Sequence, residues 1–202
     1  MNIDLAYGRH GLRVNLPRNR TTVVAPHYTP GLHNPSDALL AAIRSPINTM
    51  PLRKLALPGM NVAISVCDIT RAQPSRIMIE AILSELSGIV SMGNVTVLIA
   101  TGTHRPNTRA EQEKMLGPEI LAAVEVMNHS ASDQSSLIDI GLVGNSVPVR
   151  LNRRWMEADL RITTGFVEPH FFAGFSGGPK MVAPGLAGLD TILTLHDSVR
   201  IG

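Results

Sequence analysis

Residues 62–71 read VAISVCDITR and residues 95–106 read VTVLIATGTHRP, and these two stretches decide the fold class. Each begins with a short apolar run, which is the pattern of a buried strand, and each ends in a polar loop. Residues 75–87 lie between them and carry apolar side chains at helical spacing: Ile79, Ile82, Leu83 and Leu86. A strand, a helix and a second strand in this order are typical of a βαβ unit. We therefore predict an α/β fold with a Rossmann-like, mostly parallel sheet flanked by helices.

Further elements of the same kind follow this unit along the chain. Thr108 and Glu111 have the spacing of a capping box, so we predict a helix from that point through Leu116. Apolar and alternating runs predict three more elements: strands over 124–127 and 160–164, and between them a second hairpin over 137–151.

The segment before residue 62 has weaker patterns. Alternating apolar residues within 3–7 and 12–16, separated by glycines, predict an N-terminal β-hairpin. A short strand over 22–25 is expected next. After a proline-rich connection we predict a helix over 38–44, with Ser36 or Asp37 as its N-cap.

Composition excludes several classes of protein. Of the 202 residues, 44% are hydrophobic and 17% are charged, which is enough for a folded core and argues against intrinsic disorder. The net charge is +2 and aromatic residues make up 3%, so little is available to neutralise phosphates or to stack bases. We expect no nucleic-acid partner. The length suits one domain, and we predict a single α/β domain over 1–202.

Cysteine usage and hydropathy favour a cytoplasmic location. Cys67 is the only cysteine, so the chain forms no internal disulfide and suits a reducing compartment. The N-terminal residues lack the charged start and apolar run of a secretory signal. The longest uncharged stretch, 86–103, is broken by glycines and polar residues, so we expect no membrane span.

Three of the predicted strands run directly into loops that carry reactive side chains. The first strand leads to Asp68 and Arg71, the second to His104, and the strand over 160–164 to His170. The carboxyl ends of parallel strands lie along one edge of a sheet, and ligands bind at that edge. We therefore expect these four side chains to converge.

The segment 165–188 is unusual because it is both glycine-rich and apolar. It holds six glycines, three prolines and all four phenylalanines of the chain. Such a stretch cannot be regular helix or strand throughout, and it suggests a backbone that approaches a ligand closely in a dry pocket. Its spacing matches neither the P-loop nor the dinucleotide-binding fingerprint.

Each of these residues also has a simpler structural interpretation. Asp68 and Arg71 can form a loop ion pair, and either histidine can be hydrogen-bonded without a role in chemistry. The sequence Thr101-Gly102-Thr103 suits an ordinary turn as well as a phosphate site. The clustering of these residues at strand ends and in one loop favours a functional site.

Four motifs in this order resemble those of the lactate racemase family, the racemases and epimerases that depend on a nickel-pincer nucleotide. They are DITR at 68–71, TGTHRP at 101–106, EPHFFAGFSGGPK at 168–180, and Thr191-Ile192 followed by His196. The gaps from His170 to Lys180 and from Lys180 to His196 also match. The family has a second, C-terminal domain, which is absent here, so the chain resembles the N-terminal catalytic domain of a two-domain racemase. Pro179 departs from the family pattern, which has a basic residue there.

The resemblance implies a role for each matching position. Lys180 would carry the nickel-pincer nucleotide covalently through a thioamide, and His196 would ligate the nickel. His104 and His170 would be the general acid and base, while Arg71, oriented by Asp68, would bind a substrate carboxylate. The remaining matches would contact the cofactor: Thr70, Thr101, Gly102, Thr103, Gly177 and Gly178.

The expected function is therefore an isomerase that racemises or epimerises a small 2-hydroxy acid, lactate-like or a sugar acid, by reversible hydride transfer. Its partners would include cofactor-maturation proteins and the missing C-terminal domain. Two alternatives stay open. One is a catalytically incomplete Rossmann-like module that binds a nucleotide or phosphate. The other is a zinc hydrolase with His104, His170 and His196 as ligands, although no HExxH spacing supports it.

Overall fold

The computed structural model describes residues 1–25, 27–144 and 146–201. These residues form two compact units, Met1–His33 and Asn34–Gly202, and each is described by itself. The expectation of one domain over 1–202 stays a prediction. Within the described residues, no helix is long and apolar enough to cross a membrane.

The first unit is the predicted N-terminal hairpin. Strands β1 (Asn2–Leu5) and β2 (Leu12–Asn15) pair antiparallel, and an ion pair of 2.7 Å joins the cross-strand neighbours Asp4 and Arg13. The short helix η1 (Arg18–Arg20) follows. The predicted strand over 22–25 is wrong. These residues form no regular structure, because no neighbouring strand pairs with them in the described part of the chain.

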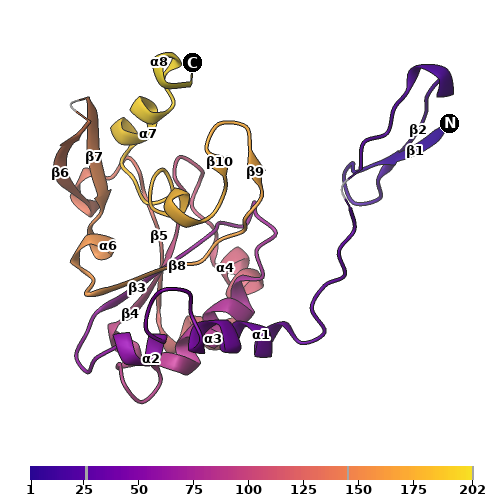
Figure 1. Ribbon diagram of the computed structural model, residues 1–202. Coiled ribbons are helices and arrows are strands. Elements are labelled where there is room, and N and C mark those ends of the chain that lie inside the picture. The colour runs from indigo at the N-terminus through magenta and orange to yellow at the C-terminus, as the bar shows by residue number, and fades with distance from the viewer. Residues whose placement is uncertain (26, 145, 202) are drawn as a thin grey trace. The chain divides into compact units, whose positions relative to one another are not determined.

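The second unit is built on a four-stranded parallel sheet with the strand order β5-β4-β3-β8, which confirms the predicted fold class (Figure 1). The strands are β3 (Val62–Val66), β4 (Val95–Ile99), β5 (Glu125–Asn128) and β8 (Leu160–Thr163). Strand β3 is buried along its whole length. Its mostly apolar sequence reflects its place between β4 and β8, where both sheet faces are covered.

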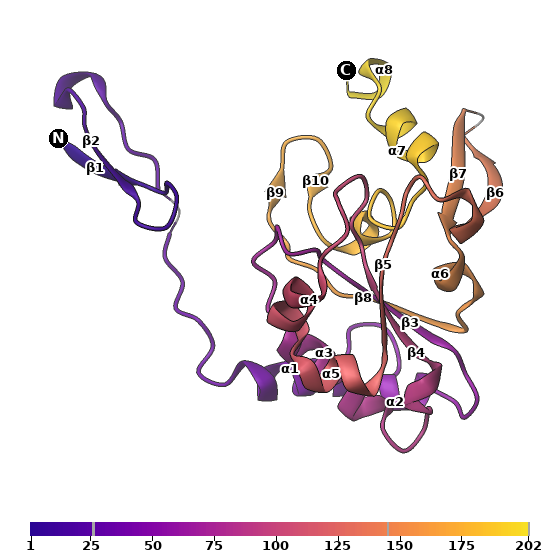
Figure 2. The same ribbon diagram turned by 180° about the vertical axis from the view of Figure 1, so that it is seen from behind.

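Helices cover one face of this sheet. They are α1 (Pro35–Arg44), α2 (Leu52–Leu55), α3 (Ser75–Leu86), α4 (Arg109–Leu116) and α5 (Pro118–Ala123) (Figure 2). Ile79 and Leu86 of α3 and Leu116 of α4 pack in a core cluster with alternate residues of β3 and β4. The predicted capping box of α4 is present. The N-cap of α1 is Asn34 rather than Ser36 or Asp37, because Pro35 fits the first helical position and starts the helix earlier.

The other face is covered by the C-terminal part of the unit. Trp155 and Leu186 pack there against Ala63 of β3 and Leu98 of β4. The second hairpin is confirmed as β6 (Leu137–Val143) and β7 (Val147–Asn152); its turn residue Asn145 lies outside the described residues. The other elements are η2 (Met92–Asn94), η3 (Gln134–Ser136), α6 (Arg153–Glu157), β9 (Pro169–His170), β10 (Gly174–Phe175), η4 (Gly178–Met181), α7 (Leu189–Leu195) and α8 (Ser198–Ile201).

Candidate active site

A cavity of about 360 Å³ lies at the carboxyl edge of the sheet. The loops after β3 and β4 form one side of it, and the segment 166–185 and helix α7 form the other. Figure 1 shows α7 and the β9–β10 hairpin at this end of the sheet. Nine of the predicted site residues line the cavity: Asp68, Arg71, Thr101, Gly102, Thr103, His104, Gly177, Lys180 and His196. His170, Thr70 and Gly178 are not among the lining residues.

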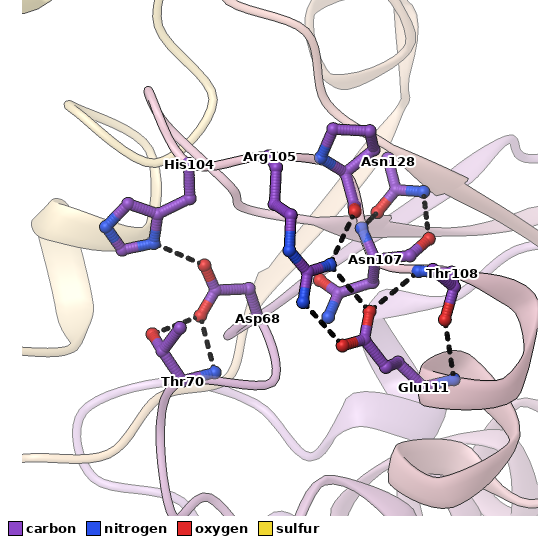
Figure 3. A network of polar contacts seen from close by, with 9 residues as sticks. Asp68, Thr70, His104, Arg105, Asn107, Thr108, Glu111 and Asn128 are labelled. Atoms are coloured by element: carbon purple, nitrogen blue, oxygen red, sulfur yellow. Dashed lines mark hydrogen bonds and ion pairs between the residues drawn. The ribbon is translucent and has the colours of Figure 1, made fainter.

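Asp68 and His104 form a close pair in the cavity wall. The Nδ1 atom of His104 lies 2.5 Å from Oδ2 of Asp68, and the other carboxylate oxygen accepts hydrogen bonds from the backbone N–H and the hydroxyl of Thr70 (Figure 3). Asp68 is only 5% exposed. Burial opposes its charge, but the hydrogen bonds from Thr70 and His104 outweigh burial and lower the pKa of Asp68. A charged Asp68 requires a proton on Nδ1, so neutral His104 presents an unprotonated Nε2.

The loop that carries His104 is fastened on both sides of that residue. Before it, the Thr101 hydroxyl donates to the His129 carbonyl at 2.8 Å, and the Gly102 N–H donates to the Gly185 carbonyl at 3.0 Å. After it, the Asn107 N–H donates to the Asn128 side chain at 2.8 Å. These bonds occupy two groups that we expected to contact a phosphate. Thr103 is the member of the Thr101–Thr103 turn whose N–H and hydroxyl have no partner among the described residues.

His170 ends strand β9 and has a different environment. Its Nδ1 accepts hydrogen bonds from the backbone N–H groups of Phe172 and Ala173, at 3.2 and 3.0 Å. Neutral His170 therefore carries its proton on Nε2, the opposite state to His104. Partial burial and the nearby charges of Lys180, Arg71 and His196 lower the pKa of His170, which favours the neutral ring.

Lys180 lies in η4 at the cavity wall. Its N–H donates to the Gly177 carbonyl and its carbonyl accepts from the Gly185 N–H, both at 3.1 Å, so its backbone is held from both sides. Desolvation, then the charge of Arg71, lower the pKa of the Lys180 amine. Its side chain forms no ion pair with any described residue. This amine is therefore available and more readily deprotonated than an ordinary lysine.

His196 directly follows α7 and lines the cavity. Its Nδ1 lies 2.7 Å from the Ile192 carbonyl oxygen, to which it donates a proton. Its Nε2 therefore has a free lone pair, the usual arrangement of a metal-binding histidine whose other nitrogen is hydrogen-bonded to a carbonyl. The ring of Phe172 packs against it at a centroid distance of 5.3 Å.

The structure corrects two expectations about this site. Arg71 lines the cavity, but no ion pair between its guanidinium and Asp68 is found within the described residues, because Asp68 is taken by His104 and Thr70. The phenylalanine-rich segment does not form the water-excluding pocket wall that we expected. Phe171 and Phe175 are 97% and 64% exposed, because β9 and β10 form a small separate hairpin, and only Phe166 of the four phenylalanines lines the cavity.

Sequence reasoning missed several residues that build the site. Ser65 in β3 is fully buried, and its hydroxyl donates to the Met181 carbonyl at 3.0 Å, which ties the sheet to the turn with Lys180. His129 is also buried, between the Asn152 side chain and the Ala187 carbonyl. A hydroxyl within the otherwise apolar run of β3 was a signal for the first contact. No local pattern indicated the second, because its partners are distant in the sequence.

A cavity at the carboxyl edge of a parallel sheet is typical of α/β proteins that bind a ligand there, and comparison with known proteins shows the family of this chain. The family model described as the lactate racemase N-terminal domain matches residues 7–201. A lactate racemase of Thermoanaerobacterium thermosaccharolyticum is 35% identical over 201 residues, which are 98% of this chain and 47% of that protein. A lactate racemase of Lactiplantibacillus plantarum is 38% identical over 155 residues, 77% of this chain and 37% of that protein.

Solved structures agree with this match. The lactate racemase apoprotein from Thermoanaerobacterium thermosaccharolyticum superposes with a TM-score of 0.81 at 34% identity, over 96% of this chain and 45% of that one. A Thermotoga maritima protein matches with a TM-score of 0.65 at 24% identity, over 84% and 42% of the two chains, and shows the fold alone. The chain belongs to the lactate racemase family and corresponds to its N-terminal domain. It spans half the length or less of the relatives it matches.

A zinc site is not supported by the geometry. Among residues 1–25, 27–144 and 146–201, no three His, Cys, Asp or Glu side chains are grouped so that they could hold a metal ion together. The three imidazoles of His104, His170 and His196 therefore do not form a ligand set of their own.

Proposed function

We propose that the chain is the part of a 2-hydroxy acid racemase or epimerase that carries the cofactor and moves the protons. The observation that carries the proposal is that Arg71, His104, Lys180 and His196 line one cavity, although up to 125 positions separate them in the sequence. A carboxylate-binding group, a proton acceptor, a primary amine and a free imidazole nitrogen are the groups that this reaction needs in one place.

The residues present fit a nickel-pincer nucleotide. Lys180 supplies an amine whose lowered pKa makes it a better nucleophile for a covalent tether, and His196 presents its Nε2 lone pair to the same cavity. The His196 imidazole would be a suitable protein ligand for nickel, because Ni(II) binds nitrogen ligands together with softer ones. When bound, this cofactor would supply the acceptor for the hydride of the substrate carbon. The cavity of about 360 Å³ has room for the ring portion of such a group beside a small acid.

The two histidines are opposite tautomers when both are neutral. The unprotonated Nε2 of His104 can take the proton from the substrate hydroxyl. His170 can return a proton to the carbonyl oxygen from its own side when both of its ring nitrogens are protonated, because a neutral imidazole N–H is too weak an acid to do so. In that turnover His104 becomes protonated and His170 becomes neutral, so the reverse reaction uses the same two groups with exchanged roles. Racemisation needs one such group for each enantiomer.

Arg71 is the group best suited to bind the substrate carboxylate. Its guanidinium lines the cavity and has no ion pair within the described residues, and a planar fork matches a carboxylate better than an ammonium does. It lines the same cavity as Lys180. A substrate held there would have its carboxylate at the same end of the cavity as the proposed tether.

A direct test is to produce the protein together with the cofactor-maturation proteins of a lactate racemase system. We expect intact-mass and peptide measurements to show a nucleotide-sized adduct on Lys180, nickel in metal analysis, and conversion of either lactate enantiomer into the other. The Lys180→Ala variant should lack all three, while Lys114→Ala, which changes an exposed lysine of α4, should keep them. Racemisation by the Lys180→Ala protein would contradict the proposal.

The alternative of a catalytically incomplete binding module is favoured by one observation. The chain spans only 37 to 47% of the lactate racemases that it matches, so substrate contacts are expected from a second domain. An adduct on Lys180 without turnover would support this alternative. The expected cytoplasmic location and the maturation partners belong to the same proposal.

A further inference from the structure

Arg105 follows His104 directly and is held by a carboxylate on the next helix. Its Nη2 lies 2.6 Å from Oε1 of Glu111 and its Nη1 lies 2.8 Å from Oε2, which is a two-pronged ion pair. Nη1 also donates to the Pro106 carbonyl at 3.1 Å. In Figure 3 the Arg105 side chain lies between Asp68 on one side and Glu111 on the other.

Glu111 is itself fixed in place. It occupies the third position of α4, where Oε2 accepts the Thr108 N–H at 2.8 Å and its own N–H donates to the Thr108 hydroxyl at 3.3 Å. The hydrogen bond from Arg105, followed by that from Thr108, lowers the pKa of Glu111 to about 2. Glu111 is therefore charged at all physiological pH values, and its position near a helix N-terminus favours that charge.

Asp68 is the other carboxylate within the influence of Arg105. Its charge contributes to the raised pKa of Arg105, after the larger contribution of Glu111. The Oδ2 atom of Asp68 is needed by His104 Nδ1, and a guanidinium is a stronger partner for a carboxylate than a neutral imidazole N–H. Without the carboxylate of Glu111, Arg105 would compete with His104 for this oxygen.

We propose that Glu111 is a positioning residue, which holds the Arg105 guanidinium away from Asp68 so that this carboxylate stays paired with His104 Nδ1. This role of Glu111 matters for catalysis only under the proposed function, in which the free Nε2 of His104 accepts a proton. Its test needs neither cofactor nor substrate. The other charged or titratable groups that line the same cavity are Cys67, Arg71, Lys180 and His196.

The experiment measures the tautomer of His104 by NMR in the ¹⁵N-histidine-labelled chain at a pH where the ring is neutral. In the wild type we expect Nδ1 to carry the proton. The Glu111→Gln variant keeps the helix cap, since a glutamine oxygen also accepts the Thr108 N–H, but it removes the charge that holds Arg105. We expect this variant to lose the Nδ1–H signal. Arg105→Gln should keep it, and the double variant Arg105→Gln/Glu111→Gln should regain it.

The matched control is Glu113→Gln, which removes the same charge from the same helix at a residue that pairs with Arg109 at 3.4 Å instead. It should leave the signal unchanged. An Nδ1–H signal retained in Glu111→Gln would overturn the proposal. Loss of the signal in Arg105→Gln or in the double variant would also overturn it, because Glu111 would then act through helix α4 itself. If Glu111→Gln does not fold, the double variant Arg105→Gln/Glu111→Gln decides the test alone. A double variant that folds and shows the Nδ1–H signal supports the proposal. A double variant that does not fold, or that folds without this signal, contradicts it. The expected pattern in a protein without racemase activity would contradict the proposed function and still support the role of Glu111.

Discussion

The loop after β4 and the β9–β10 hairpin each carry one of the two histidines proposed to move protons, but they are built in different ways. The first is fastened to β5, to the turn after Lys180 and to helix α4 on both sides of His104. The second has strands of only two residues, and its Phe171 is 97% exposed to solvent. One histidine is oriented by a buried carboxylate from another loop, and the other by two N–H groups of its own turn.

The two regions hold their imidazoles as opposite neutral tautomers by placing different partners at Nδ1. A carboxylate at Nδ1 requires a proton there and leaves Nε2 unprotonated. Backbone N–H groups at Nδ1 require a lone pair there and put the proton on Nε2. The loop after β4 also holds His104 in the cavity lining, whereas His170 in the β9–β10 hairpin is not among the lining residues.

The largest effect is expected from removing either histidine. In the cofactor-loaded protein, His104→Ala and His170→Ala should each lower kcat for lactate racemisation by about 10²- to 10⁴-fold, because each variant lacks one of the two proton-transfer groups. His33→Ala, in the N-terminal unit, is the control and should have wild-type kcat. A His170→Ala protein with normal turnover would show that the hairpin is not part of the proton machinery.

A smaller but asymmetric effect is expected from Asp68→Asn. The asparagine oxygen can still accept from Thr70, but its NH₂ group then faces Nδ1 and favours the wrong tautomer of His104. We expect kcat to fall about 10²-fold, because the imidazole is still present but its tautomer is wrong. The ¹⁵N spectrum should show a changed ring for His104 and an unchanged one for His170; equal changes in both would remove the distinction between the two regions.

Two glycine substitutions compare the packed and the projecting parts of the loop for stability. A Cβ atom on Gly165 would lie 2.8 Å from the Gly177 Cα atom, so Gly165→Ala should lower the free energy of unfolding by about 1–3 kcal/mol. A Cβ atom on Gly174, in β10, would meet no atom within 4 Å. Only the φ of +76° at this residue disfavours alanine, so Gly174→Ala should lower the free energy of unfolding by about 1 kcal/mol. Urea unfolding of both variants measures the difference, and the reverse order would contradict the packing described here.

The smallest effect concerns the pH dependence of stability through His129, which anchors the His104 loop. His129 is 2% exposed, and its burial lowers its pKa. The folded protein keeps this ring neutral while the unfolded chain takes up a proton below about pH 6.5, so its contribution to stability is lost as the pH falls. Between about pH 7.5 and about pH 5.5 the wild type should lose more of its thermal stability than His129→Gln. Parallel losses in both proteins would place the titrating group elsewhere.

The sheet could be predicted well from the sequence because its signals are local. The apolar run that opens residues 62–71 coincides with strand β3, and the capping box of Thr108 and Glu111 marks the start of α4, since apolar runs and cap spacing need no knowledge of distant contacts. The strand over 22–25 failed for the opposite reason. Its apolar residues satisfy the pattern, but a strand requires a hydrogen-bonded neighbour, which a local pattern does not reveal.

The same limit applies to the site. Of the four side chains expected to converge from the order of strand ends, Asp68, Arg71 and His104 line one cavity, whereas His170 is not among its lining residues. The order of strand ends did not indicate which partner Asp68 would choose, because Arg71 is three residues away and His104 is thirty-six away, and the nearer residue was favoured. Burial of the carboxylate and the course of two loops decided that choice.

The central claim is that the two neutral imidazoles are opposite tautomers, and one ¹⁵N NMR spectrum of the histidine-labelled chain tests it most directly. With both rings neutral, we predict that His104 has its proton on Nδ1 and His170 has its proton on Nε2. A spectrum in which both rings carry the proton on the same nitrogen would contradict the account.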